Sequence, residues 1–186
     1  INHDKSEHKE KIAAENNQET FGNLSSLLKC FEVAKKDQSD LIYFVEDDYL
    51  HYEHSLVDML NTYERVSSQH KDEIIVCPSD YPFNYMNNEK TNILIGSQQH
   101  WRTITKMLCT FMISKKMFQK HIDNFEKTCE KRHEPFEKYL NKILESEIGI
   151  SPIKSLAVHM TNVNSSYGLS PFIDIKKLWE ENKIDQ

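Results

Sequence analysis

Hydrophobic residues follow one of two spacings, depending on the segment of the chain. In five segments they recur every three or four positions, the spacing of an amphipathic helix. Between these segments lie short, largely apolar runs of the kind that form strands covered on both faces. The predicted helices are 24–34, 55–66, 114–125, 134–145 and 175–181, and the predicted strands are 41–45, 73–77, 92–96, 103–113 and 155–160. This alternation indicates an α/β domain with a mainly parallel central sheet.

Local signals refine the ends of these elements. Ser114 is a candidate N-cap, and Pro135 falls in the first turn of the helix predicted over 134–145, where proline is tolerated. Residues 1–20 are polar and charged without a sustained apolar period, so we expect a mobile loop or a frayed helix there. Because the residues from Ile1 to Asp4 resemble the end of a strand, we expect the domain to lack its first strands.

Composition excludes several classes of protein. The chain has 186 residues, of which 38% are hydrophobic and 10% aromatic, enough for one domain with a real core. With 29 acidic and 23 basic residues the formal charge is −6, which disfavours nucleic acid as a partner. No apolar run approaches the ~20 residues of a membrane span, and we expect no signal peptide within this stretch. The four cysteines show no Cys-x-x-Cys pair, so we expect reduced thiols and a cytoplasmic location.

Three consecutive acids, Glu46, Asp47 and Asp48, directly follow the predicted buried strand 41–45. Ligands of open α/β sheets bind outside the carboxyl ends of the strands. Adjacent carboxylates repel one another, and a hard divalent cation that also holds phosphate oxygens would relieve that repulsion. The alternative is that these acids are solvated, or cap the helix that follows.

The segment Leu41–Leu50, LIYFVEDDYL, follows a helix that begins near Gly22-Asn23-Leu24-Ser25 and resembles the central segment of GT-A fold glycosyltransferases. The resemblance covers roughly 17–159 in motif order. It implies a three-layer, Rossmann-like sheet and a single catalytic domain over 1–186 that lacks its N-terminal nucleotide-binding segment. The family's Asp-x-Asp motif maps its metal-binding last acid onto Asp48 and its first acid onto Glu46, where this chain departs from the pattern by carrying glutamate.

The resemblance also implies an activity. The expected reaction moves a sugar from a UDP- or GDP-linked donor to a glycan, glycoprotein or other hydroxyl acceptor, with Mn²⁺ or Mg²⁺ on the donor diphosphate. Glu46 would approach the nucleotide-sugar, or the metal through water, and Asp47 would also approach the nucleotide-sugar. His159, at the end of an apolar run, matches the late histidine that such enzymes often supply to the metal, and the alternative is an ordinary histidine at a strand end.

Further candidates are assigned by position. Trp101 and Arg102, predicted in a loop between strands, would stack on a sugar or clamp a phosphate, unless the tryptophan is packed in the core and the arginine solvated. Asp80, which ends the strand 73–77, and Glu134 and Glu137, at a predicted helix start, are the candidates for the base that an inverting enzyme needs. The sequence does not choose among these three acids, and a retaining enzyme would need none of them.

Two other functions remain open at this stage. One is a metal-dependent phosphohydrolase that uses the acidic triplet with His51 or His159. Two-metal hydrolases need well-spread ligands, whereas the chain has one dense acidic cluster, which favours a single metal. The other is a non-catalytic carbohydrate-binding remnant of a larger enzyme.

Overall fold

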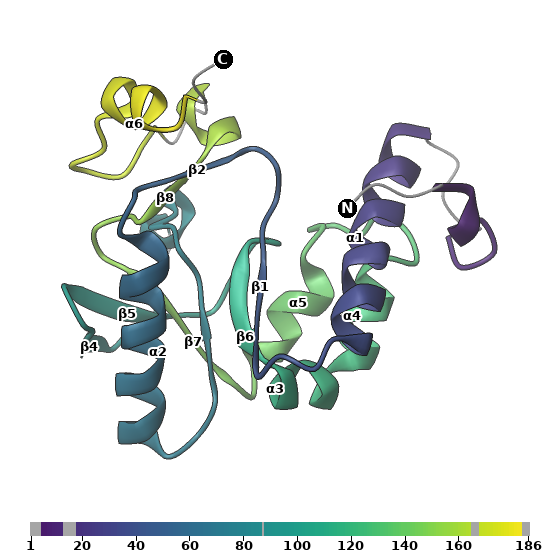
Figure 1. Ribbon diagram of the computed structural model, residues 1–186, viewed down its shortest axis with the longest axis horizontal. Coiled ribbons are helices and arrows are strands. Elements are labelled where there is room, and N and C mark those ends of the chain that lie inside the picture. Colours follow the sequence, from purple (N-terminus) through teal and green to yellow (C-terminus); the bar gives the residue numbers. More distant parts are fainter. Residues whose placement is uncertain (1–4, 13–17, 87, 165–167, 184–186) are drawn as a thin grey trace.

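The structure is a computed structural model, and it describes residues 5–12, 18–86, 88–164 and 168–183. It is a mixed α/β domain built on a six-stranded sheet with the order β1-β6-β3-β7-β5-β4, beside a two-stranded sheet of β2 and β8 (Figure 1). The strands are β1 (Leu41–Phe44), β2 (Tyr49–His51), β3 (Ile74–Val76), β4 (Ile93–Ile95), β5 (His100–Ile104), β6 (Phe111–Ser114), β7 (Ile148–Pro152) and β8 (Ala157–His159).

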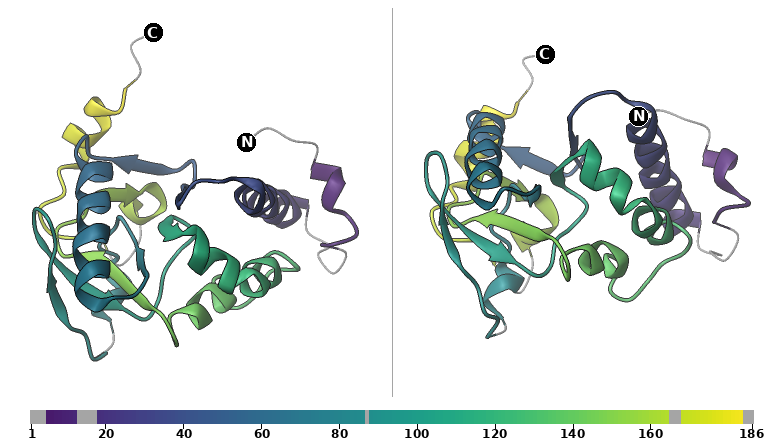
Figure 2. Two further views of the ribbon diagram at one scale, coloured as in Figure 1. Left: turned by 60° about the horizontal axis from the view of Figure 1, so that its bottom comes forward. Right: turned by 90° about the horizontal axis from the view of Figure 1, so that it is seen from below.

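Helices lie on both faces of the six-stranded sheet, with α2 on one side and α1, α3, α4 and α5 on the other (Figures 1 and 2). The α-helices are α1 (Gln18–Lys36), α2 (Ser55–His70), α3 (Lys115–Lys120), α4 (Ile122–Thr128), α5 (Lys138–Ile143) and α6 (Ile175–Glu181). Three short 3₁₀ helices are η1 (Lys5–His8), η2 (Pro82–Tyr85) and η3 (Met160–Asn164).

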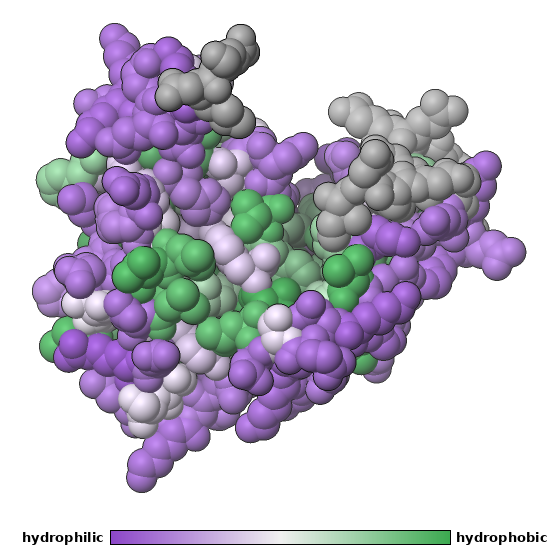
Figure 3. Space-filling view, viewed as in Figure 1, coloured by the Kyte–Doolittle hydropathy of each residue, from purple (hydrophilic) through white to green (hydrophobic). Residues whose placement is uncertain are grey.

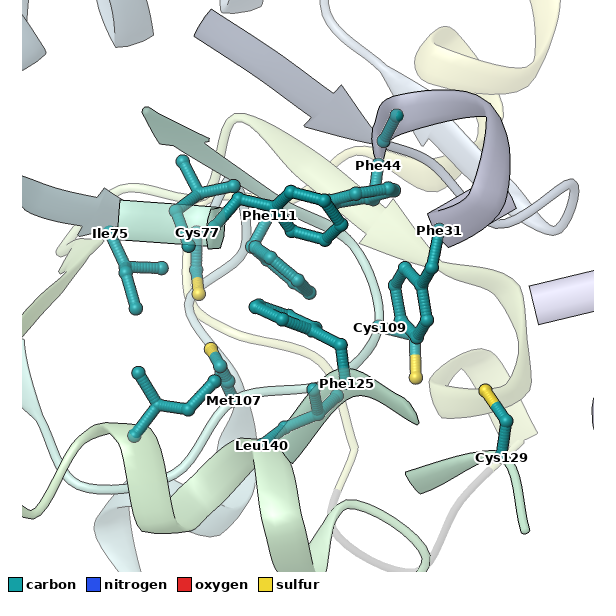
Figure 4. Packing of buried hydrophobic residues seen from close by; sticks show 14 of the residues in the cluster. Phe31, Phe44, Ile75, Cys77, Met107, Cys109, Phe111, Phe125, Cys129 and Leu140 are labelled. Atoms are coloured by element: carbon teal, nitrogen blue, oxygen red, sulfur yellow. The ribbon is translucent and has the colours of Figure 1, made fainter. Parts of the chain in front are cut away.

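Alternate residues of β1, β3 and β6 enter two separate hydrophobic clusters. In β3, Ile75 belongs to the cluster beneath α1 and α4, whereas Ile74 and Val76 belong to the cluster beneath α2. This division follows from the two-residue period of a strand. Figure 4 shows the first cluster, in which the ring of Phe44 from β1 packs edge-on against that of Phe31 from α1 at 5.2 Å.

The prediction of a mainly parallel sheet is wrong. Of the pairs in the described sheet, only β3 and β7 run parallel, and β6 lies antiparallel between β1 and β3. A continuously apolar run shows that both faces of a strand are covered, and this coverage is independent of the direction of the neighbouring strands. Because β1, β3 and β7 still share one direction, their carboxyl ends lie at the same edge, as the candidate site requires.

The region between Ile93 and Ile104 differs from the expected pattern. The backbone N–H of Gly96 donates to the Gln99 carbonyl at 2.9 Å, closing a hairpin between β4 and β5. Trp101 and Arg102 therefore lie within strand β5, not in a loop, and the second strand predicted over 103–113 is replaced by the end of β5, a loop and β6.

Two further elements differ from the prediction. The helix predicted over 134–145 begins only at Lys138, after Glu137 as its N-cap, so that Pro135 precedes the helix. The helix predicted over 114–125 is interrupted at His121 into α3 and α4, although Ser114 does cap its start, accepting from the Met117 N–H at 3.1 Å.

The N-terminal segment contributes to the core. Within residues 5–12, η1 is followed by a turn, and Ile12 is 1% exposed in the cluster beneath α1. Residues 1–4 and 13–17, where the rest of the predicted loop falls, lie outside the described residues. All four cysteines are free thiols. In the described part of the chain, no helix has both the length and the apolar character needed to cross a bilayer.

Candidate metal centre and acidic site

Asp48 and His159 face each other at the start of the small sheet. Tyr49 pairs with His159 in the antiparallel register of β2 and β8, which places Asp48 directly beside the histidine. Asp48 Oδ2 lies 2.8 Å from His159 Nε2 and accepts a hydrogen bond of 3.2 Å from the Thr161 hydroxyl. The Asp48 side chain is 41% exposed, so the pair is open to a ligand from solvent.

Tyr49 fixes the position of this pair. Its ring stacks on the His159 imidazole with the centroids 4.7 Å apart and the planes 11° from parallel. Its hydroxyl is hydrogen bonded to that of Tyr81 at 2.8 Å, and both tyrosines are buried. Since Tyr81 follows β3, this bond ties the small sheet to the carboxyl edge of the large one.

The distance of 2.8 Å between Asp48 Oδ2 and His159 Nε2 is that of a direct ion pair, and it is also close to the spacing of two ligands on a shared cation. Mg²⁺ holds its ligands octahedrally at about 2.1 Å, which places neighbouring ligand atoms about 3.0 Å apart. A carboxylate oxygen and an imidazole nitrogen also suit Mn²⁺. With a cation on Nε2, the imidazole proton must sit on Nδ1, a buried nitrogen for which the described residues provide no partner.

The remaining ligands would have to come from outside the pair. Among the described residues, no group of three or more His, Cys, Asp or Glu side chains is arranged to hold a metal ion. Magnesium in proteins is commonly held by one or two carboxylates together with substrate phosphates and water. Two protein ligands with open positions therefore suit a cation that arrives with a phosphorylated ligand.

Glu46, two residues before Asp48 in the same loop, is partly buried. Its backbone N–H donates to the Thr110 hydroxyl at 3.0 Å, and this hydroxyl lies 3.3 Å from the Glu46 carboxylate. Burial, with the nearby charges of Asp48 and Glu137, raises the pKa of Glu46 to about 7. The resemblance to GT-A enzymes implied that Cys109, Thr110 and Phe111 lie on a strand at the acceptor site, but nothing in the sequence indicated that Thr110 contacts Glu46.

The three predicted base candidates fall in different environments. Glu137 is half-buried, and burial followed by the charge of Glu134 raises its pKa. Glu134 is exposed. The structure therefore brings Glu137 close enough to influence Glu46 electrostatically, with Glu134 beside it at the surface.

Asp80, in contrast, is engaged by the protein itself. Its carboxylate pairs with Arg102 and accepts hydrogen bonds from the hydroxyls of Tyr85 at 2.6 Å and Ser170 at 2.8 Å. Burial raises the pKa of Asp80, and these three donors oppose the rise. A carboxylate held in this way has little capacity left to accept a substrate proton, so its geometry fits a structural role.

Trp101 and Arg102 are both buried. Trp101 is 0% exposed in the cluster beneath α2, which matches the alternative of a core tryptophan and leaves no face free for a sugar. Arg102 is not solvated as that alternative supposed, because its guanidinium pairs with Asp80 and lies 4.2 Å from the centre of the Tyr85 ring. Asp47 is exposed beside the pair of Asp48 and His159.

No family model and no curated protein sequence matches the chain.

The raised pKa of Glu46 predicts how stability depends on pH. In the unfolded chain the carboxyl titrates near its usual value of 4.5, and in the folded chain near 7. The folded state therefore binds the proton more tightly, and its stability falls as the pH rises from about 4.5 to about 7. In Glu46→Gln this loss should be absent. Urea unfolding of the metal-free chain across this range, with Glu64→Gln at an exposed position of α2 as the control, tests the expectation. Parallel stability curves for Glu46→Gln and wild type would contradict it.

Proposed function

We propose that the protein is a metal-dependent glycosyltransferase that moves a sugar from a nucleoside-diphosphate sugar to a hydroxyl acceptor. The observation that carries this proposal is the 2.8 Å pair of Asp48 and His159, held open at the edge where β1 and β3 end. The partly buried Glu46, held by Thr110 in the same loop, supplies a second polar group. The chain's resemblance to GT-A enzymes in the segment Leu41–Leu50 gives the same assignment.

In this proposal the residues of the loop and its neighbours have different roles. Asp48 and His159 would hold Mn²⁺ or Mg²⁺, and such an ion would supply positive charge to stabilise a diphosphate leaving group. Thr161 and the stacked ring of Tyr49 keep these two side chains in place. Glu46, anchored by Thr110, would bind a sugar hydroxyl.

Glu137 is the carboxylate best suited to take the proton of the acceptor in an inverting reaction. Its raised pKa makes it a stronger base than an exposed glutamate when it is ionised. Glu134 is exposed, and Asp80 is occupied by Arg102, Tyr85 and Ser170. We also propose that the sheet with helices on both of its faces has the three-layer GT-A architecture.

The test is a calorimetric titration of the chain with UDP- and GDP-sugars in the presence of Mn²⁺ and in the presence of EDTA. The proposal expects affinity at least about tenfold higher with Mn²⁺, equivalent to about 1.4 kcal/mol. Equal affinity in both conditions would contradict it. Release of phosphate from simple phosphoesters would favour the hydrolase, and carbohydrate binding without any nucleotide or metal response would favour the carbohydrate-binding remnant.

A further inference from the structure

Strand β4 forms one outer edge of the six-stranded sheet. It is hydrogen bonded to β5 on one side, and no other described strand pairs with it (Figure 1). Edge strands are normally protected by charged side chains, prolines or bulges. The three residues of β4 are Ile93, Leu94 and Ile95, and the span 91–99 contains no proline and no Asp, Glu, Lys or Arg, although these four charged residues make up 28% of the chain. β4 is therefore an edge without the usual protection.

The hydrogen bonds of the hairpin show which backbone groups of β4 face outward. The N–H of Gly96 donates to the Gln99 carbonyl at 2.9 Å, so residue 96 bonds toward the neighbouring strand. Bonded and non-bonded residues alternate along an antiparallel pair, and Leu94 therefore also bonds to β5. The N–H and C=O groups of Ile93 and Ile95 point the other way, and they have no hydrogen-bond partner among the described residues.

The side chains of these two residues add apolar surface to the edge. Ile93 and Ile95 are 57% and 61% exposed, and they lie on the face of the sheet opposite α2, because Leu94 between them packs in the cluster beneath α2. Ile153 extends this surface. Its N–H donates to the carbonyl of His100, the residue that pairs with Ile95, and its side chain is 37% exposed. Unpaired backbone groups and exposed apolar side chains therefore occur together at this end of the sheet.

A second copy of β4 fits this edge. When two copies run antiparallel about Leu94, Ile93 of each copy lies opposite Ile95 of the other. The outward N–H and C=O groups of these residues can then exchange about four hydrogen bonds. Lys90, the nearest charged residue along this strand, falls opposite Gln98, so no like charges meet. The edge is thus complementary to itself in backbone, in side chains and in charge.

The other edge of the sheet, β1, does not have this property. Figure 3 shows hydrophobic surface over β1 and the first half of α2. However, Asp40 directly precedes β1, and the acidic triplet of Glu46, Asp47 and Asp48 follows it. Two antiparallel copies of β1 would bring the acids of one copy beside those of the other, and like charges on paired strands are destabilising. Charge therefore favours β4 as the edge that accepts a second copy.

We propose that two copies of the chain associate through β4 into a dimer with twofold symmetry and a continuous sheet. Because both copies use the same edge, the pairing leaves no free β4 and the assembly closes at two chains. The interface consists of one short strand and a few apolar side chains, and interfaces below about 1,200 Å² form transient complexes. The dimer is therefore reversible, with a Kd on the order of 10 µM. It does not depend on the proposed transfer function.

Sedimentation velocity of the full chain at concentrations from about 1 to about 200 µM tests the association. The weight-average mass should rise with concentration from that of one chain toward that of two. A mass that stays at one chain over the whole range would overturn the proposal. So would a chain that remains monomeric and instead binds an extended peptide at β4, because the edge would then accept a strand of another protein.

Paired charge substitutions test the strand and its register. In Ile93→Lys, Ile95→Lys and in Ile93→Glu, Ile95→Glu, each new charge lies opposite a like charge of the second copy, so each variant alone should be monomeric. An equimolar mixture of the two should form a heterodimer at least about tenfold tighter than either self-association, which also shows that both variants are folded. The control Val33→Lys, Trp179→Lys, at exposed apolar positions of α1 and α6, should dimerise like wild type. A mixture that stays monomeric would overturn the proposal.

A proline substitution tests the outward N–H of Ile95 by itself. Ile95→Pro removes a donor that β5 does not use, and proline is tolerated in edge strands where its missing N–H would face solvent. The variant should remain folded by circular dichroism and dimerise at least about tenfold more weakly, since each dimer loses two hydrogen bonds. Ile95→Val, which keeps the N–H, should dimerise within about threefold of wild type. A dimer that is unaffected by Ile95→Pro would overturn the proposal.

Discussion

Asp48→Asn is expected to abolish the Mn²⁺-dependent part of nucleotide-sugar binding and, with it, sugar transfer. The substitution keeps the shape of the side chain and its contact with the Thr161 hydroxyl, but it removes the negative oxygen that faces His159 at 2.8 Å. A hard cation held by two protein side chains depends strongly on the one charged ligand. The Kd for a UDP- or GDP-sugar in Mn²⁺ should rise about 100-fold, to the value measured in EDTA.

The matched control is Asp123→Asn, which removes one negative charge at an exposed position of α4. It should leave the Mn²⁺ dependence of binding unchanged. A second variant, His159→Gln, should weaken the metal response with the carboxylate intact. If Asp48→Asn retains affinity and turnover within a few-fold of wild type, the metal role of this residue is wrong.

Arg102→Ala should have the largest effect on stability. Arg102 is 8% exposed and its guanidinium neutralises the buried Asp80 carboxylate, so removing it leaves an unpaired buried charge. Breaking a buried pair in this way costs about 3–5 kcal/mol of the free energy of unfolding. The loss should be measured by urea unfolding, with Arg65→Ala on the exposed side of α2 as the control.

The deficit of Arg102→Ala should also depend on pH. Without the guanidinium, burial holds the pKa of Asp80 above its unfolded value. The folded state then binds the proton more tightly, so stability is present at low pH and is lost as the pH rises through the folded pKa. The deficit should therefore be smaller at about pH 5 than at about pH 7.5. A loss below about 1 kcal/mol, or one that does not vary with pH, would show that Asp80 does not depend on this partner.

The elements that the sequence predicted well are those with a clear period. The helix spacing of Leu24 to Ala34 and of Leu56 to Tyr63 corresponds to α1 and α2, and the apolar runs at 41–45 and 73–77 correspond to β1 and β3. The position of the acidic triplet at the end of β1 follows from the same pattern. Strand β7 was missed because Gly149 and Pro152 weaken its apolar signal. A side chain at position 149 would be crowded, because its Cβ would lie only 2.5 Å from the Leu144 side chain.

Contacts between distant segments account for what the sequence could not predict. Trp101 is buried because Gly96 leaves room for its ring, and a Cβ at Gly96 would lie 2.2 Å from that ring. The partners of Asp80 come from three separate segments, at Tyr85, Arg102 and Ser170. The pairing of β2 with β8, which brings Asp48 to His159 across more than a hundred residues, likewise had no local signal.

The most direct measurement is anomalous diffraction at the manganese edge from crystals of the chain soaked with Mn²⁺ and UDP or GDP. We expect a single strong peak within about 2.3 Å of both Asp48 Oδ2 and His159 Nε2, in contact with the diphosphate oxygens. A manganese peak at another place, or a nucleotide ordered away from this loop with no metal beside Asp48, would contradict the proposed metal site.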